Sequence, residues 1–219
     1  MSDEGATLTV WLPTNNIPND HVIDHNLFDD RTYSGSNGGE SMRVGDSSTS
    51  IYTSHTIVES NYFNQCSGDV EIISSKSCDN IYRYNTFVNS QGCLVFRHGK
   101  RCSAIGNFFF GNGNPLTGGI RVIDEDHVVI NNYFQDLRGT ESRAALSLQT
   151  GIISSPLNGY FQVKNALIAF NTFVNCHTNI IISVSYGSVN NGLTNTLSPR
   201  DCVFANNIVK GISNNLIYQ

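Results

Sequence analysis

Short apolar segments that end at an asparagine recur along the whole chain. In each copy an apolar residue, usually Phe, stands two positions after the Asn. The seven copies are Asn26-Leu-Phe28, Asn61-Tyr-Phe63, Asn85-Thr-Phe87, Asn107-Phe-Phe109, Asn132-Tyr-Phe134, Asn171-Thr-Phe173 and Asn207-Ile-Val209. Successive Asn residues are separated by 35, 24, 22, 25, 39 and 36 residues. A base period of about 22 to 25 residues with longer excursions is typical of a solenoid, whose excursions form loops.

This repeat predicts a parallel β-helix of about seven rungs. No 3.6-residue apolar stripe is present, which argues against leucine-rich repeats, and a β-propeller needs a period of about 40 residues or more. Asn tolerates the left-handed backbone that a sharp corner requires, and stacked Asn side chains can bond from rung to rung. The Phe residues should then point inward and stack. We therefore expect an all-β fold with a single domain over residues 1–219.

Neither end of the predicted helix carries an amphipathic capping helix. The ends of a solenoid expose strand edges and core side chains, which need a cover. We therefore expect the chain to be a section of a longer solenoid, or to pair through its ends, for instance as a homo-oligomer.

Composition excludes several classes of function. Charged residues make up only 14% of the chain and the net charge is −5, which gives no reason to expect nucleic-acid binding. There is no run of 18 apolar residues, and the acidic start Met-Ser-Asp-Glu is unlike a signal peptide. None of the six cysteines forms a C-x-x-C pair, so a zinc site is not expected. Buried free thiols are the simplest interpretation, although a disulfide stays open.

Because charged side chains are scarce, those that fall in register stand out. Asp69 and Glu71 are separated by one apolar residue, and alternate side chains of a strand share a face, so both carboxylates should point outward. Lys76, Arg97 and Arg121 lie nine, ten and eleven residues before the corner Asn of their own rungs. Similar offsets predict a row of three cations beside the carboxylates. A solvated charged stripe is the alternative, but a site for an anionic substrate fits the pattern better.

A segment with a double Gly, at residues 36–45, lies one repeat earlier. Asn37 in this segment would bring an amide oxygen near Asp69 and Glu71, and such hard oxygen donors suit calcium. Lys76 could remove a carbon-bound proton beside a carboxylate, provided that a metal and Arg97 neutralise that carboxylate. The chemistry that needs this set is β-elimination on a uronic acid polysaccharide.

Four segments resemble polysaccharide lyase family 6, which contains the alginate lyases and chondroitinase B. They are residues 37–47 (NGGESMRVGDS), 70–77 (VEIISSKS), 96–99 (FRHG) and 118–123 (GGIRVI). The resemblance covers nearly the whole chain, and the motifs keep the order that they have in the family. It implies a right-handed parallel β-helix that uses Ca2+, and a secreted or periplasmic protein.

The resemblance also implies roles for single residues. Lys76 would be the base that takes the C5 proton, and Arg97 the acid or electrostatic partner at the leaving glycosidic oxygen. The calcium ligands would be Asn37, Asp69 and Glu71, and the residues lining the substrate groove would be Glu40, Arg43, His98 and Arg121. Two features depart from the family: Asp69 stands where Glu is usual, and the chain is much shorter than usual.

Alginate is the expected substrate, and dermatan sulfate is the alternative within the family. Dermatan sulfate carries sulfates besides its carboxylates, yet Lys100 and Arg101 form the only adjacent basic pair outside the predicted row. A non-catalytic carbohydrate-binding β-helix is a third hypothesis, and the presence of Lys76, Arg97 and Glu71 argues against it. Block preference, endo or exo action and oligomeric state are left open.

Overall fold

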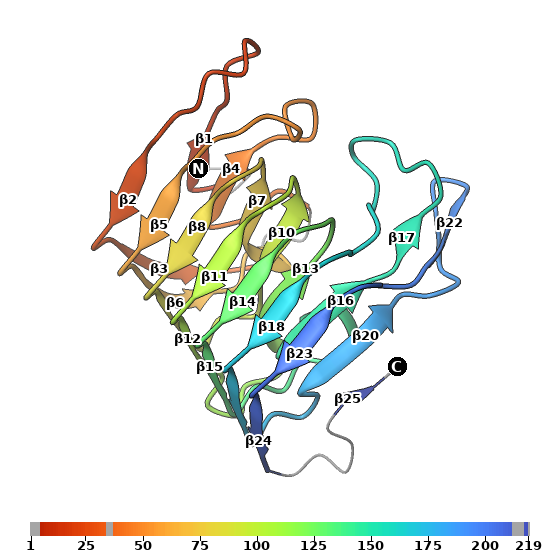
Figure 1. Ribbon diagram of the computed structural model, residues 1–219. Helices are drawn as coiled ribbons and strands as arrows, with labels where there is room; N and C mark the ends of the chain where they lie inside the picture. Colours follow the sequence, from red (N-terminus) through yellow and green to blue (C-terminus); the bar gives the residue numbers. More distant parts are fainter. Residues whose placement is uncertain (1–4, 34–36, 212–216, 219) are drawn as a thin grey trace.

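The computed structural model describes residues 5–33, 37–211 and 217–218, and its strands stack as the rungs of a parallel β-helix (Figure 1). Three parallel sheets, here named A, B and C, run along the stack. In the described ranges the one helical element is a 3-10 turn, η1 (Glu141–Arg143). The predicted all-β solenoid is therefore confirmed.

Sheet A has eight strands: β1 (Leu8–Val10), β4 (Met42–Gly45), β7 (Glu71–Lys76), β10 (Gly92–His98), β13 (Thr117–Val122), β16 (Leu146–Gln149), β20 (Ile180–Val184) and β25 (Ile217–Tyr218). Sheet B has seven: β2 (Val22–Asp24), β5 (Ile57–Glu59), β8 (Ile81–Arg83), β11 (Ser103–Ile105), β14 (Val128–Ile130), β18 (Leu167–Ala169) and β23 (Val203–Ala205). Sheet C also has seven: β3 (Leu27–Arg31), β6 (Tyr62–Cys66), β9 (Thr86–Val88), β12 (Phe108–Phe110), β15 (Tyr133–Gln135), β19 (Thr172–Val174) and β24 (Ile208–Lys210).

A fourth, antiparallel sheet is built from the two longest excursions of the repeat. Its strands are β17 (Gly151–Ile152), β21 (Val189–Asn190) and β22 (Leu193–Leu197), in the order β17-β22-β21. Figure 1 shows β17 and β22 beyond the ends of the rungs, on the side of β16 and β20. The insertions thus form structure of their own next to sheet A.

The corner asparagines form a continuous ladder between sheets B and C. From Asn61 to Asn207, the Oδ1 atom of each corner Asn accepts the backbone N–H and the side-chain amide of the corner Asn one rung earlier, and Asn26 is the first donor. The expectation that the Asn itself takes the left-handed conformation is wrong. Positive φ belongs to the preceding residue, for example 57° at Tyr84 and 58° at Phe170. The Asn is required for its amide, which satisfies buried backbone groups.

The Phe residues of the repeat stack in the core as predicted. Neighbouring rings are nearly parallel, with centroids 4.7, 4.8, 4.6, 5.0 and 4.8 Å apart along the series Phe28, Phe63, Phe87, Phe109, Phe134 and Phe173. Successive rungs hold the rings at the strand spacing, so each rung repeats the contact of the one before. The stack gives sheet C a rigid inner face.

The cysteines are free thiols, and all except the partly exposed Cys202 are buried, which confirms their simplest interpretation. Across the described part of the chain, no helix is both long and apolar enough to span a membrane.

Candidate active site

The residues singled out in the sequence gather on the outer side of sheet A, where four neighbouring strands end. Arg43 lies on β4, Lys76 ends β7, Arg97 and His98 end β10, and Arg121 lies on β13. These strands are consecutive neighbours in the sheet, although their sequence positions are far apart. Parallel stacking of the rungs therefore assembles the site.

The register does not place the three cations in one row, so that part of the prediction is wrong. Lys76 pairs with His98, whereas Arg121 pairs with Val95. The pairing of β7 with β10 shifts just before His98, which leaves Arg97 in a β-bulge. A bulge inserts one extra residue and re-aims its side chain, so a constant sequence offset does not give a constant position on the face.

Arg97 is held from two directions. Its Nη1 donates to the carbonyl oxygen of Gly159 at 2.8 Å, and its Nη2 donates to that of Asn158 at 3.2 Å. On the sheet, its Nε lies 3.7 Å from Oε1 of Glu71. Burial lowers the pKa of Arg97, and the neighbouring Glu71 opposes this shift. A guanidinium with a lowered pKa gives up a proton more readily than an exposed arginine does.

Tyr160, which sequence reasoning missed, covers this face from the loop between β17 and β18. Its ring centroid lies 4.5 Å from the guanidinium carbon of Arg97. The ring also packs on an apolar cluster formed by Cys93, Val95 and Ile123. The sequence held one signal of this cover, because apolar residues at outward positions of a strand would otherwise meet water.

Lys76 meets Glu40 at the other side of the site. The Nζ atom of Lys76 lies 3.9 Å from Oε1 of Glu40, and the Lys76 side chain is 18% exposed. Burial raises the pKa of Glu40; Lys76 opposes this rise, while Glu71 and Asp69 reinforce it. Glu40 therefore lies within electrostatic reach of the candidate base and of both predicted carboxylate ligands.

His98 is a buried, neutral imidazole. Its Nε2 lies 3.1 Å from Oγ of Ser47, and its Nδ1 lies 3.3 Å from Nη1 of Arg97. Burial lowers the pKa of His98 to about 2, and the charges of Arg97 and Lys76 add to this effect. The ring therefore acts near neutral pH as a fixed polar contact between Ser47 and Arg97, without exchanging a proton.

Arg43 and Arg121 lie at the same level of sheet A on its outer face. Arg43 pairs with Ser74, Ser74 pairs with Val95, and Val95 pairs with Arg121 on successive strands. The Nη2 atom of Arg121 donates to Oε1 of Gln149 at 2.5 Å, and its guanidinium carbon lies 5.5 Å from the Tyr160 ring centroid. The guanidinium of Arg43 stacks 5.3 Å from the ring centroid of Trp11. Both arginines thus flank the site on aromatic supports.

The predicted metal ligands lie at the start of β7. Glu71 is its first residue, and Asp69 lies two positions before it. Asp69 accepts the backbone N–H of Gly38 at 2.8 Å through Oδ2, and that of Val70 at 2.5 Å through Oδ1. Since Gly38 follows Asn37, the first of these bonds brings the segment with Asn37 to Asp69.

The donor set fits calcium in chemistry. Carboxylate and amide oxygens are hard ligands, and Oε2 of Glu40 is a further buried oxygen without a hydrogen-bond partner. No three His, Cys, Asp or Glu side chains of the described residues converge closely enough to hold a metal by themselves. An amide oxygen such as that of Asn37 would have to complete the set, and calcium binding at these residues stays a prediction.

Comparisons with known proteins identify the family of this chain. The family described as Chondroitinase B matches residues 1–219. The structure of an arginine-to-alanine variant of the PL6 family alginate lyase AlyGC is 40% identical, with a TM-score of 0.87 over 98% of this chain and 30% of that chain. A mannuronic acid specific polysaccharide family 6 lyase from human gut microbiota is 36% identical, with a TM-score of 0.81 over 94% of this chain and 47% of that chain.

A third structure, a PL6 alginate lyase in complex with a trisaccharide, is 29% identical, with a TM-score of 0.85 over 94% of this chain and 49% of that chain. A search of curated proteins gave no match. The chain belongs to polysaccharide lyase family 6, the family of chondroitinase B. It spans less than half the length of each of these three relatives.

Proposed function

We propose that this chain carries the catalytic site of a lyase that cleaves alginate by β-elimination. The observation that supports this most directly is the meeting of Lys76, Arg97 and the carboxylates of Asp69 and Glu71 on neighbouring rungs of a family 6 β-helix. The chemistry of elimination needs a base, a group at the leaving oxygen and a counter-charge for the uronate carboxylate. Each need has a candidate among these residues.

In the proposed reaction, the Lys76 amine takes the C5 proton of a uronate residue. The electron pair of that C–H bond forms the C4–C5 double bond, and the bond from C4 to the glycosidic oxygen breaks. The leaving oxygen takes its proton from Arg97, or is stabilised by the charge of Arg97. Burial lowers the pKa of Arg97 and keeps water away from its guanidinium, so that this group interacts more strongly with the negative charge that develops on the leaving oxygen.

Calcium, if held by Asn37, Asp69 and Glu71, would neutralise the substrate carboxylate and so acidify the C5 proton. The residues of the chain would orient the sugar around this centre. Arg43 and Arg121 offer cations on either side of the site, and the neutral His98 and the buried Glu40 fix Arg97 and Lys76 in place.

Alginate is favoured over dermatan sulfate by the pairing of the remaining basic residues. Lys100 is bound to Glu125, and Arg101 forms two hydrogen bonds with Asp79, at 2.7 and 2.9 Å. The only adjacent basic pair outside the site is therefore already neutralised. A sulfated substrate would find no free cationic cluster there.

The test is the rise in ultraviolet absorbance of the unsaturated uronide product, measured on alginate and on dermatan sulfate. The wild-type protein should produce it on alginate, whereas Lys76→Ala should not. Lys210→Ala, which removes an exposed lysine on β24 of sheet C, is the matched control and should stay active.

If product forms only from dermatan sulfate, the proposed substrate is dermatan sulfate and not alginate. If neither polysaccharide yields product but the protein binds alginate, the chain is a carbohydrate-binding β-helix and the proposed elimination fails.

A further inference from the structure

A cavity of about 270 Å³ adjoins the candidate active site at the start of β7. It is lined by Tyr33, Ser67, Asp69, Gln91, Leu116 and Arg143. Asp69 is the residue that the cavity shares with the predicted metal ligands described above.

Arg143 is the cation of this cavity, and its side chain has no hydrogen-bond or ion-pair partner among the described residues. Its Nε is buried without a hydrogen-bond acceptor, and no described residue forms an ion pair with its guanidinium. By contrast, Lys76 faces Glu40 and Arg97 faces Glu71. A buried N–H without an acceptor is costly, so an anionic ligand that reaches the Nε of Arg143 would satisfy it.

The backbone of Arg143 is firmly positioned. Arg143 ends η1, where its N–H donates to the carbonyl of Thr140 at 2.8 Å. Two glycines allow the turn to pack closely: a Cβ at Gly139 would lie 2.1 Å from the carbonyl oxygen of Arg143, and a Cβ at Gly118 would lie 2.9 Å from it. The arginine is therefore presented from a fixed element.

Arg143 also belongs to the charge pattern of the active-site face. Burial raises the pKa of the Cys93 thiol to about 12, and Arg121 and Arg143 both oppose this rise. Both guanidinium groups are thus within electrostatic reach of the same buried thiol. Arg143 lies in η1, a few residues before Ser147, which is the residue of β16 that pairs with Arg121.

The rest of the cavity offers surfaces that suit a sugar. The Tyr33 ring and the Leu116 side chain, 66% and 46% exposed, provide apolar contact. The Gln91 side chain and the Ser67 hydroxyl provide polar contact. Asp69 is the one carboxylate, and both of its oxygens already accept backbone N–H groups.

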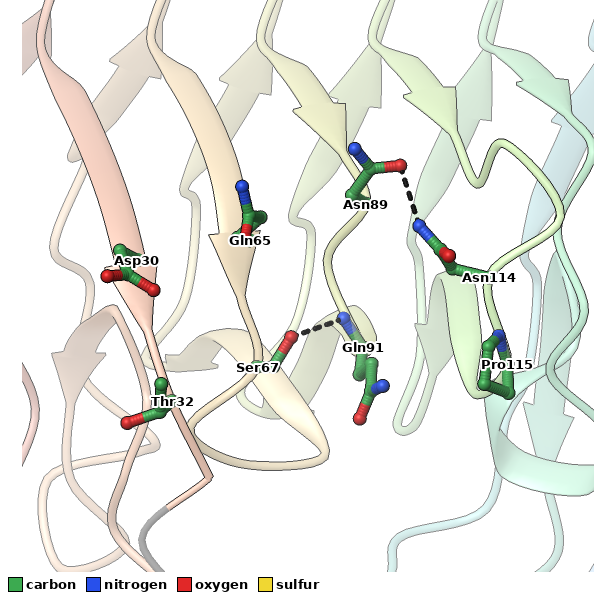
Figure 2. Close-up of a pocket in the computed structure, with 8 residues that line it drawn as sticks. All are labelled: Asp30, Thr32, Gln65, Ser67, Asn89, Gln91, Asn114 and Pro115. Atoms are coloured by element: carbon green, nitrogen blue, oxygen red, sulfur yellow. Dashed lines mark hydrogen bonds between the residues drawn. The ribbon is translucent and has the colours of Figure 1, made fainter.

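The cavity continues into a second one of about 390 Å³, which shares Ser67 and Gln91 with it (Figure 2). Figure 2 shows amide and hydroxyl side chains from neighbouring rungs along this continuation, among them Gln65, Asn89 and Asn114. Asp30 is its single charged residue. An extended oligosaccharide could therefore leave the site across hydrogen-bonding groups repeated at the rung spacing of about 4.8 Å.

We propose that Arg143, with Tyr33, Gln91 and Leu116, forms a distal subsite that binds the carboxylate of a uronate residue away from the cleaved bond. This subsite rests on the proposed polyuronate lyase function and adds a residue that determines how longer substrates bind. It predicts that affinity for oligouronates depends on Arg143 only when the oligomer is long enough to reach it.

The experiment measures binding of purified oligouronates of increasing length, from two to six residues, by calorimetry. Lys76→Ala is the reference protein, because it should bind without cleaving. Arg143→Gln is added to this background, since glutamine keeps much of the side-chain stem, and Arg143→Lys is the second variant. Arg200→Ala is the matched control, because it removes an arginine whose side chain is 61% exposed and pairs with Asp201.

For the longest oligomers, Arg143→Gln should weaken binding about tenfold, as expected for loss of a charge-assisted hydrogen bond. The shortest oligomers that bind should show no difference, and Arg143→Lys should fall between the two. Added salt should shrink the effect, because the subsite is open to solvent. Arg200→Ala should bind as the reference does.

Equal affinities at every length would overturn the subsite. An equal loss at every length, including the shortest, would also overturn it, since Arg143 would then act at the central site. If the Lys76→Ala reference binds no oligouronate at all, the proposed lyase function fails first, and the subsite falls with it. Thermal unfolding of each variant confirms that the fold persists.

Discussion

The Nε atom of Arg97 lies 3.7 Å from Oε1 of Glu71, across neighbouring strands of sheet A. This contact joins the candidate acid to a predicted metal ligand. Each residue therefore influences the other: removal of the carboxylate would free the guanidinium and would also take away an oxygen donor.

We predict that Glu71→Gln lowers turnover on alginate by at least tenfold and abolishes its response to added calcium. The amide keeps the shape of the side chain but loses the charge that pairs with Arg97 and that a calcium ion needs. Turnover measured after chelation and after calcium is restored checks this.

Glu59→Gln provides the control, since Glu59 forms a comparable pair with Arg83 on sheet B. A Glu71→Gln protein with wild-type turnover and calcium response would remove Glu71 from the site.

Substitution of Lys76 should separate catalysis from stability. We expect Lys76→Ala and Lys76→Arg to reduce product formation by orders of magnitude. Alanine has no amine to take the proton, and the guanidinium of arginine stays protonated near neutral pH and cannot accept one. Arg97→Lys should keep more activity than Lys76→Arg if positive charge is what the leaving oxygen needs. Circular dichroism should show an intact β-helix. Substantial activity in Lys76→Ala would reduce Lys76 to a structural ion pair with the buried Glu40.

We expect the Tyr160 ring to raise kcat by holding Arg97 in position. Tyr160→Leu removes the cation–π contact, which is worth roughly 0.5–2 kcal/mol, and should lower kcat more than it changes thermal stability. Tyr160→Phe keeps the ring and should restore most of kcat. If Tyr160→Phe and Tyr160→Leu have the same kcat, the ring does not position Arg97.

The phenylalanine stack gives a stability test with a matched pair of adjacent residues. Phe109 is fully buried between Phe87 and Phe134, whereas Phe108 is 45% exposed on the opposite side of β12. We expect Phe109→Ala to cost roughly 3–5 kcal/mol of unfolding free energy, as other buried Phe truncations do, and Phe108→Ala to cost far less. Denaturant unfolding measures both, and similar costs would contradict the stack.

Asp124 should make stability depend on pH. Burial raises its pKa from 3.8 to about 7, and Lys100 opposes the rise. The folded protein therefore holds this proton more tightly than the unfolded chain does. The resulting stability is present below pH 3.8 and is lost as the pH rises through about 7.

Asp124→Asn should remove this loss, because the amide stays neutral and can still accept the backbone N–H of Glu125. Melting temperatures compared at pH 5 and pH 8 check the prediction. A wild-type protein and an Asp124→Asn variant with the same pH dependence would contradict it.

The sequence by itself determined the solenoid. The spacing of Asn and Phe fixed the number of corners, the inward face of sheet C and the parallel stacking, because a period-two strand that repeats rung after rung leaves one way to bury its Phe. It also named Lys76, Arg97, Asp69 and Glu71, since motifs of the family surround them.

Tertiary structure decided how these residues meet. A bulge, invisible in the spacing, moved Arg97 out of the row expected with Lys76, because one extra residue changes the side to which later side chains point. The loop that brings Tyr160 and two carbonyl oxygens to Arg97 comes from far along the chain. Such contacts depend on how an insertion folds back over the sheet, and no local pattern encodes that path.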